Sequence, residues 1–252
     1  MPQNFENQDP NWRKKQKIKF RYTTFRSKAQ IKSMNTLEAI SLRHTVRKFQ
    51  KKPLDSEVVE KLNARITENN QKYGLNLKLV TGDSNGVWGV LRLFLAKNVN
   101  NYLILSGPNE STTGELLGYT GIDVALYAQT LGLNSWWIGG TYRRKAVEAL
   151  ADGSLSAGIV VLGYGENQGK FHKSKEAVDV SAYEGETPDW FLRGVEAALL
   201  APTALNKQGF FISGRGSDVS ISCEGAFAEI DRGIVKYHFE VGAGKENFNW
   251  AD

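Results

Sequence analysis

The stretch APTALNKQGFF, residues 201–211, decides how the second half of this chain folds. It follows the apolar run FLRGVEAALL, residues 191–200, which has helical character. Pro202 cannot continue that helix and pushes the residue before it toward an extended backbone, so the chain turns here and leaves as the extended segment GFFIS. The turn carries a hydroxyl at Thr203 and an amide at Asn206. These polar groups either cap a helix or hold a ligand.

Length and composition indicate a globular protein with a full hydrophobic core. The chain has 252 residues, of which 41% are hydrophobic and 11% aromatic. No apolar run approaches the ~18–20 residues of a membrane-spanning helix, so we expect no membrane partner. The single cysteine, Cys223, excludes an internal disulfide and suits the cytoplasm. Its segment VSISC alternates apolar residues with serines, which predicts a strand with a buried thiol rather than a catalytic cysteine.

The positive charge of the chain is confined to its first 33 residues. They hold nine Lys/Arg and two acidic residues, whereas the rest of the chain holds 23 basic and 25 acidic residues. This leader lacks the apolar core of a secretory signal. A disordered basic arm, a transit-like peptide and an upstream extension before Met34 stay open as explanations. We expect a non-folded extension over 1–33 and no nucleic-acid partner.

The remainder alternates between helical and extended patterns. Asn35 or Thr36 is expected to cap the first helix, and Asp55 or Ser56 the second. The expected helices lie within 35–43, 53–71, 86–97, 114–133, 143–151, 191–200 and 229–244, and the expected strands within 75–80, 101–107, 157–165, 209–213 and 218–223.

Two of these helices suggest an internal repeat. At an offset of 112 residues, Gly121 and Ile122 match Gly233 and Ile234, and Gly132 matches Gly244. Glycines at the same spacing in two helices indicate duplication, although two amphipathic helices can also agree by coincidence.

Common nucleotide and metal motifs are absent. GYGENQGKF and GAGKENF lack the Ser/Thr and the glycine spacing of a P-loop, and no G-x-G-x-x-G follows a strand. The three histidines are scattered, so we expect no metal. No G-x-S-x-G suggests a hydrolase.

Four short stretches together resemble the FMN-dependent nitroreductases. RHTVRKF, residues 43–49, resembles the family's opening Arg-x-Ser/Thr-x-Arg/Lys motif with its aromatic residue. LGLNSWWIGG, residues 131–140, resembles the helix end and backbone turn that lie against the flavin. LGYGENQGKFHKSK, residues 162–175, resembles the strand and basic segment near the family's C-terminus. APTALNKQ, residues 201–208, resembles the family's Ala-Pro-Ser-x-x-Asn-x-Gln turn.

The order of these stretches departs from the family. An ordinary member has its Ala-Pro-Ser turn soon after the arginine motif, and its homodimer builds each flavin site from both subunits. Here the turn follows about 150 residues later, after a helix that VVEKLNARI may mirror. The resemblance therefore implies an α+β, nitroreductase-like fold, with a mixed β-sheet packed by helices and a pseudo-dimer made from one chain. We expect a first half over 34–182, a shortened second half over 183–252, and a monomer with an internal pseudo-two-fold axis, with a further dimer left open.

The resemblance also implies which residues bind the flavin. Its phosphate would meet charged donors at Arg43, Thr45, Lys173 and Lys175, although Lys173 and Lys175 could belong to a solvated loop. Arg47 would stabilise negative charge on the reduced ring. The remaining cofactor-binding positions are the ring-side turn, Trp137, Ile138, Gly139 and Gly140, and the rim, Pro202, Thr203, Ala204 and Asn206. Trp137 could equally be a core residue, and no catalytic side chain is required.

The function implied is that of a cytoplasmic FMN-dependent oxidoreductase. It would take a hydride from NAD(P)H and reduce a nitroaromatic, a quinone or a similar small acceptor by a ping-pong route. The shortened second half motivates an alternative, a flavin-binding or flavin-sensing protein without turnover. A nucleic-acid-binding protein is a further alternative that rests only on the basic leader.

Overall fold

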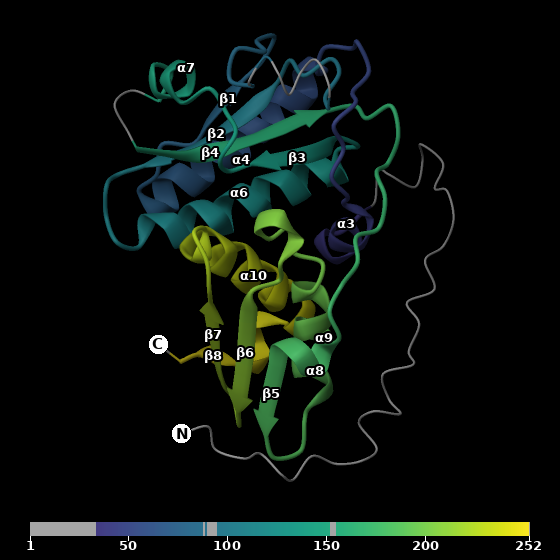
Figure 1. Ribbon diagram of the computed structural model, residues 1–252, viewed down its shortest axis with the longest axis vertical. Helices are drawn as coiled ribbons and strands as arrows, with labels where there is room; N and C mark the ends of the chain where they lie inside the picture. The colour runs from purple at the N-terminus through teal and green to yellow at the C-terminus, as the bar shows by residue number, and fades with distance from the viewer. Residues whose placement is uncertain (1–33, 88, 90–94, 152–154, 252) are drawn as a thin grey trace.

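The computed structural model describes residues 34–251 apart from 88, 90–94 and 152–154 (Figure 1). The predicted extension over 1–33 therefore lies outside the described residues, as do residues 88 and 90–94 of the predicted helix in 86–97. The elements are α3 (Thr36–Leu42), α4 (Ser56–Tyr73), β1 (Lys78–Val80), β2 (Tyr102–Gly107), α6 (Thr113–Thr130), β3 (Asn134–Ile138), α7 (Arg144–Glu148), β4 (Leu155–Gly163), α8 (Ala177–Val180), β5 (Ser181–Glu184), α9 (Asp189–Ala198), β6 (Phe210–Arg215), β7 (Asp218–Cys223), α10 (Ala228–Ala243) and β8 (Asn249–Trp250), with short 3-10 turns η1 (Ala204–Asn206) and η2 (Lys245–Asn247).

Local sequence explains where several elements begin and end. Asn35 caps α3, because its Oδ1 accepts the Glu38 N–H at 2.9 Å while Glu38 Oε2 accepts the Asn35 N–H at 3.1 Å. Asp55 occupies the cap position of α4, but its carboxylate binds Lys52 and Tyr164 instead of the helix. α4 ends at Gly74, whose φ of 65° is the left-handed conformation that closes many helices.

The elements form two sheets with helices between them (Figure 1). The first sheet has the order β1-β2-β4-β3 and is antiparallel throughout. The second has the order β5-β6-β7-β8, in which β5–β6 and β7–β8 are parallel pairs and β6–β7 is antiparallel. Helix α6 packs on the first sheet and on α10, and α10 packs with α9 on the second. The layers therefore run sheet, helix, helix, sheet.

The two halves repeat one order of elements. In the first half the order is α4-β1-β2-α6-β3, and in the second it is α9-β6-β7-α10-β8. The second half has no strand that corresponds to β4 within the described residues, because β8 pairs directly with β7. The predicted α+β fold class with two helix-packed halves is confirmed. The predicted boundary between 182 and 183 falls inside β5, and the bounds of the two halves stay a prediction.

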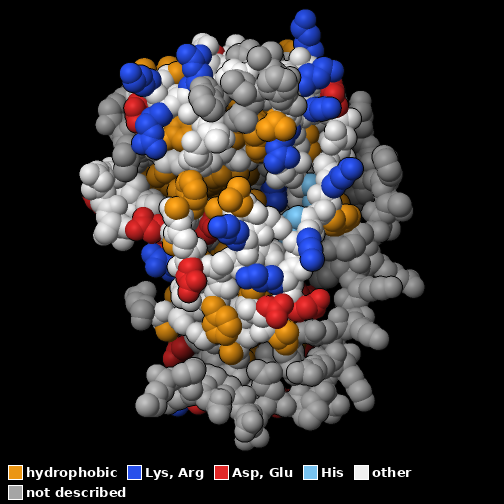
Figure 2. Space-filling model, viewed as in Figure 1, with side chains coloured by type: hydrophobic (Ala, Val, Ile, Leu, Met, Phe, Trp, Pro, Cys, Tyr) orange, Lys and Arg blue, Asp and Glu red, His pale blue; other side chains and the backbone are white. Residues whose placement is uncertain are grey.

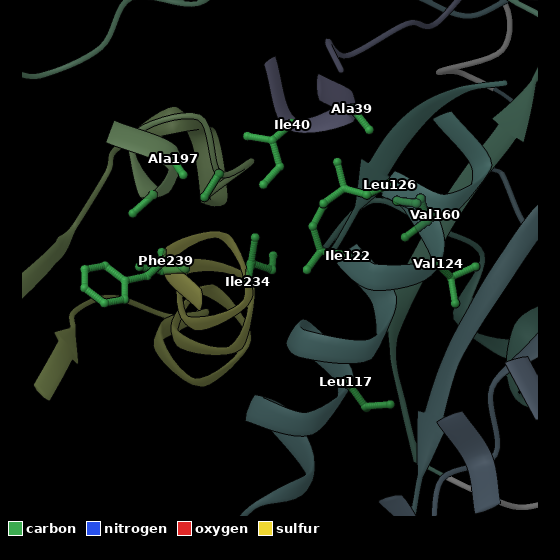
Figure 3. Packing of buried hydrophobic residues seen from close by; sticks show 14 of the residues in the cluster. Ala39, Ile40, Leu117, Ile122, Val124, Leu126, Val160, Ala197, Ile234 and Phe239 are labelled. Atoms are coloured by element: carbon green, nitrogen blue, oxygen red, sulfur yellow. The ribbon is translucent and has the colours of Figure 1, made fainter. Parts of the chain in front are cut away.

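One hydrophobic core crosses both halves (Figure 3). Ile122 and Leu126 of α6 point toward Ile234 of α10, and Ile40 of α3 lies above them (Figure 3). Side chains from β4, α9 and both central helices belong to the same buried cluster. Apolar faces of both halves are therefore buried against each other. A second buried cluster, which includes Tyr102 and Trp136, lies within the first half alone.

Glycines bring the two central helices into backbone contact. A Cβ on Gly118 would lie 2.1 Å from the Ile230 carbonyl oxygen, and a Cβ on Gly233 would lie 1.9 Å from the Glu115 carbonyl oxygen. Residues 118 and 230 are separated by the repeat offset of 112, so equivalent positions of α6 and α10 touch each other. Such a contact is expected where two related helices cross at a pseudo-two-fold axis.

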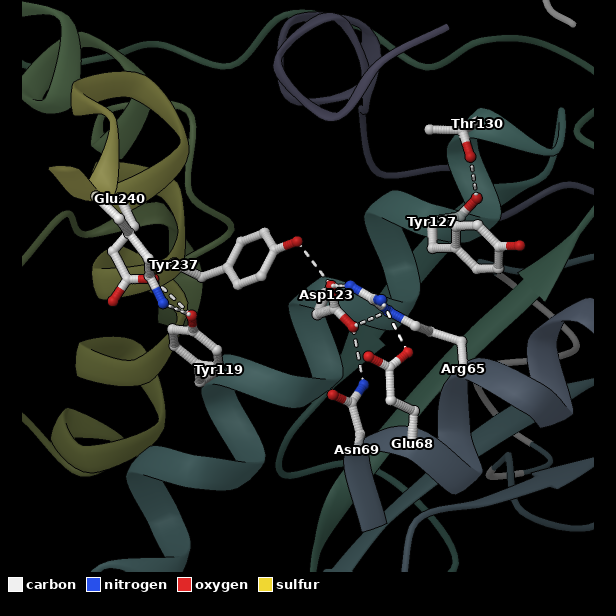
Figure 4. A network of polar contacts seen from close by, with 10 residues as sticks. Arg65, Glu68, Asn69, Tyr119, Asp123, Tyr127, Thr130, Tyr237 and Glu240 are labelled. Atoms are coloured by element: carbon white, nitrogen blue, oxygen red, sulfur yellow. Dashed lines mark hydrogen bonds and ion pairs between the residues drawn. The ribbon is translucent and has the colours of Figure 1, made fainter. Parts of the chain in front are cut away.

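A buried polar network fastens α4 to the same helix pair (Figure 4). The Asp123 carboxylate of α6 accepts hydrogen bonds from Arg65 Nε at 2.8 Å and Nη2 at 2.7 Å, and from Asn69 Nδ2 at 2.8 Å. Tyr237 of α10 donates its hydroxyl to the same carboxylate at 2.7 Å. Asp123 is 3% exposed, so this network replaces the water that its charge would otherwise need.

Candidate functional site

The segment RHTVRKF runs along the outer edge of β3. Thr45 forms a parallel bridge with Ser135, and the Val46 N–H donates to the Ser135 carbonyl at 3.0 Å. β3 is the last strand of its sheet, so this edge is free to pair. Val46 and Phe49 are buried and anchor the segment, while Thr45 and Arg47 are exposed. The predicted arginine motif is thereby held beside the predicted ring-side turn.

Arg43 is a buried cation to which the described part of the chain supplies no anion. It follows α3, is 5% exposed, and its Nε has no hydrogen-bond partner among the described residues. Burial lowers its pKa to about 10, and no carboxylate contributes to that shift. The guanidinium therefore stays protonated at neutral pH. A buried charge of this kind is costly unless a ligand of opposite charge pairs with it, and a phosphate suits an arginine fork.

The two tryptophans of β3 point to opposite faces of the sheet. Trp136 lies under the Arg47 guanidinium, with 5.4 Å between the guanidinium carbon and the ring centroid. Trp137 faces α6, where a Cβ on Gly121 would lie 2.8 Å from its indole. Trp137 is half-buried and Ile138 is buried, so both pack against the protein as well as leading into the Gly139–Gly140 turn.

The Gly139–Gly140 turn lies against the start of α10. A Cβ on Gly139 would be 3.1 Å from Phe227 Cε1, and one on Gly140 would be 3.6 Å from Phe227 Cζ. Phe227 is the residue before α10, so the second half supplies a wall beside a turn of the first half. Sequence reasoning missed Phe227, because only the folded chain brings it there.

The predicted rim turn has an unusual backbone. Leu205, Asn206 and Gln208 have φ values of 52°, 54° and 47°, in the left-handed region that residues with a side chain rarely adopt. The Thr203 hydroxyl accepts the Gln208 N–H at 3.1 Å, and Gln208 Nε2 donates to the Leu199 carbonyl at 2.7 Å. These bonds close the turn after α9, as expected for a polar cap.

Two further elements hold this turn from outside. The Ala204 N–H donates to both oxygens of Asp231 on α10, at 3.0 and 3.1 Å. On the other side, Asn206 Nδ2 donates to the Lys173 carbonyl at 2.8 Å. Lys175 donates its N–H to Gln208 Oε1 at 2.7 Å and its Nζ to the Gln208 carbonyl at 2.9 Å. The basic segment therefore contacts the turn directly, and Lys175 helps to position it.

Histidines gather where the arginine motif meets the basic segment. His44 packs edge-on against Phe171, with 4.5 Å between the ring centroids. Burial lowers the pKa of His44, and the charges of Arg43 and His172 lower it further. His238 of α10 is fully buried, and burial lowers its pKa to about 3. Figure 2 shows histidine surface beside a hollow between the upper and lower parts of the molecule. The wide spacing of the histidines in the sequence concealed this cluster.

The structure thus links all four predicted stretches around one region. Thr45 and Arg47 lie along β3, and Arg43 ends α3 just before them. The predicted ring-side positions belong to β3 and its turn: Trp137, Ile138, Gly139 and Gly140. The basic segment, Lys173 and Lys175, borders the rim turn of Pro202, Thr203, Ala204 and Asn206. Phe227 and Asp231 join the last two groups through α10.

A family model described as "Putative TM nitroreductase" matches residues 35–243. The chain belongs to this nitroreductase family. Members of a nitroreductase family are oxidoreductases, and the described chain has the family's α+β fold. No protein with curated annotation matches the chain.

One solved structure resembles this fold over most of the chain, and two others match a little over half of the chain. A nitroreductase-like protein from Thermotoga maritima has a TM-score of 0.64 with 20% identity, over 90% of this chain and 89% of that one. An FMN-dependent nitroreductase from Clostridium difficile R20291 has a TM-score of 0.42 with 16% identity, over 56% of this chain and 92% of that one. An NADH dehydrogenase/NAD(P)H nitroreductase from Bacteroides thetaiotaomicron has a TM-score of 0.45 with 14% identity, over 59% and 97%. Among the helices described for this nitroreductase, none is both long and apolar enough to span a membrane.

Proposed function

We propose that this nitroreductase binds one FMN per chain and transfers a hydride from NAD(P)H to a nitroaromatic, a quinone or a similar small acceptor. The observation that carries the proposal is Arg43, a buried guanidinium whose Nε lacks a partner and which no described carboxylate neutralises. Among the groups that a nitroreductase could bind, the phosphate of FMN supplies the charge that this position lacks.

The residues around Arg43 suit the rest of that cofactor. Thr45 and Lys173 add a hydroxyl and a second cation beside the phosphate position, and Arg47 adds a cation beside β3. The Gly139–Gly140 turn offers backbone without side chains, and the Pro202–Asn206 turn supplies the opposite rim. Bound FMN would supply the hydride chemistry. The protein's part is to hold the phosphate, orient the ring and exclude water.

The two halves would replace the two subunits of an ordinary dimer. The rim turn follows α9, but the equivalent connection after α4 has no Pro-Thr turn. Tyr119 occupies the position equivalent to Asp231, 112 residues earlier. Its ring packs edge-on against Tyr73 and Tyr237, with centroids 5.9 and 5.0 Å apart. Aromatic packing therefore fills the region that would face a second flavin, which supports a single site.

Replacing Arg43 tests the phosphate assignment. Arg43→Ala should weaken FMN binding by about one to two decades, because a hydrogen bond to a charged group contributes roughly 1.5–3 kcal/mol. Riboflavin lacks the phosphate, so its affinity should change little. Quenching of flavin fluorescence measures both. Lys51→Ala removes an exposed charge two residues after the end of this segment and serves as the control. Equal losses for FMN and riboflavin would contradict a phosphate role for Arg43.

Stoichiometry tests the fused site. We expect one FMN on a 28.0 kDa particle, with binding unchanged on dilution, because both halves of the site belong to one chain. Light scattering combined with flavin absorbance measures mass and flavin content together. Binding that disappears as a dimer dissociates would show that the site lies between chains.

Reduction by NAD(P)H separates the enzyme from a passive flavin protein. Loss of the yellow colour on addition of NADH or NADPH without oxygen, and its return with a quinone, would support the proposed reaction. A flavin-loaded protein that neither nucleotide bleaches would instead support flavin binding without turnover.

A further inference from the structure

We propose that Asp231 is a positioning residue, whose carboxylate fixes the rim turn, residues 202–208, against the Gly139–Gly140 turn through the start of α10. We call this contact between the Asp231 carboxylate and the rim turn the clamp. Its expected effect on flavin binding rests on the proposed function. The clamp itself does not, because its contacts lie within the protein.

The contact geometry identifies the clamp. Both Asp231 oxygens accept the single N–H of Ala204, at 3.0 and 3.1 Å. Asp231 lies one helical turn after Phe227, and its own N–H donates to the Phe227 carbonyl at 2.8 Å. Phe227 in turn contacts the Gly139–Gly140 turn. Two turns from different halves therefore meet on the five consecutive residues 227–231, at the start of α10.

Packing alone does not explain why a charged side chain occupies position 231. Asp231 is 9% exposed and forms no ion pair within the described part of the chain. Burial raises the pKa of its carboxyl to about 6, and the Ala204 N–H opposes that rise. Among the described residues, the Ala204 N–H and the N-terminal end of α10 favour its negative charge. An apolar side chain would fill the same space without this cost, so the carboxylate is kept for its contact.

Neighbouring charged groups do not compensate Asp231. Arg232 and Lys236 of α10 both pair with Glu115 of α6, each at 2.6 Å. Cys223 of β7 is a neutral thiol whose pKa is raised to about 12 by burial and then by Asp231. The Ala204 N–H is therefore the one hydrogen-bond donor that the structure gives this carboxylate.

The backbone of the turn explains why a clamp is needed. Leu205, Asn206 and Gln208 all have positive φ, and such conformations persist only where the surroundings over-determine them. Leu205 at the tip is 89% exposed, so its own side chain adds little packing. The Lys173–Lys175 segment holds the turn on one side, and Asp231 holds it on the other.

Hydrogen exchange and proteolysis of the flavin-free chain test the clamp. We compare Asp231→Leu, which removes the acceptor, with Asp231→Asn, whose amide oxygen can still accept from Ala204. In Asp231→Leu, exchange of the peptide covering 201–209 and tryptic cleavage after Lys207 should both accelerate about tenfold or more, because a charge-assisted hydrogen bond is lost. In Asp231→Asn both should stay within about threefold of the wild type. Asp218→Leu, at an exposed carboxylate of β7, is the control.

A pH series provides evidence even if Asp231→Leu fails to fold. Exchange of the 201–209 peptide, corrected for the intrinsic pH dependence, should differ between pH 5 and pH 7.5 in the wild type, because the Asp231 pKa of about 6 lies between them and the Ala204 N–H favours the ionised carboxylate. Asp231→Asn should lack this difference. His44 and His172 are present in both proteins, so their titration cancels. Equal pH dependence in the two proteins, or unchanged exchange in Asp231→Leu, would overturn the clamp.

Flavin titration then separates this inference from the proposed function. If both the clamp and the flavin site are correct, Asp231→Leu should lower the affinity for FMN about tenfold, and Asp231→Asn should change that affinity little. Faster exchange in Asp231→Leu, together with no FMN binding by the wild type, would support the clamp and reject the flavin. Unaltered exchange in Asp231→Leu, together with FMN binding by the wild type, would reject the clamp alone.

Discussion

Gly233→Ala should destabilise the protein by more than about 3 kcal/mol, although alanine normally favours a helix over glycine by about 1 kcal/mol. The added methyl group would lie 1.9 Å from the Glu115 carbonyl oxygen and 2.7 Å from the Tyr119 nitrogen. Backbone atoms cannot rotate away, so α6 and α10 would have to separate. Denaturant unfolding followed by circular dichroism measures the loss.

Two glycines provide the comparison. Gly118→Ala should be similarly costly, because its methyl group would lie 2.1 Å from the Ile230 carbonyl oxygen. At Gly209 the nearest atom outside the local chain, the Glu224 carbonyl oxygen, would be 3.4 Å away, which is an ordinary contact. Gly209→Ala should therefore change stability by less than about 1 kcal/mol. If Gly233→Ala behaved like Gly209→Ala, the two helices would be farther apart than described.

Asp123→Ala should cost about 3 kcal/mol, at the lower end of what breaking a buried ion pair costs. The change removes the acceptor shared by Arg65, Asn69 and Tyr237 (Figure 4). The Arg65 side chain is 36% exposed and can turn partly toward water, which limits the loss. Because the network joins α4, α6 and α10, unfolding should remain a single transition at a lower denaturant midpoint.

Glu68→Ala is the matched control. Glu68 also pairs with Arg65, at 3.1 Å, but its side chain is 63% exposed, so the loss should stay below about 1 kcal/mol. A loss for Asp123→Ala no larger than that of Glu68→Ala would show that water satisfies Arg65 and Tyr237 once the carboxylate is gone.

Local signals in the sequence predicted most of the fold. The Asn35 cap, the long apolar pattern of α6 and the stop at Pro202 each depend on neighbouring residues, and each is confirmed. The predicted strand around Cys223 is confirmed as β7, although its thiol is only half-buried. The structure explains the repeat offset of 112 residues, because the equivalent residues 118 and 230 are in contact between α6 and α10.

Long-range pairing was harder to predict. β3 was not among the expected strands, because its short run NSWWI follows a helix directly and owes its conformation to pairing with β4. β5 and β8 are likewise only four and two residues long and lie beside strands distant in sequence. Asp231 and Phe227 reach the candidate site only because α10 packs across α6, and no local pattern marks them. The predicted flavin contacts themselves stay predictions.

The contact between Gly118 and Ile230 has a consequence for how such a protein can change over time. On the axis of a dimer of identical chains, a residue meets its own copy, so a small residue would face a small residue and a large one a large one. Here glycine meets isoleucine at matched positions, and Tyr119 matches Asp231. One mutation alters one side of the axis only. One half can therefore specialise in binding and the other in structural support, because a harmful substitution in one half is not repeated in the other.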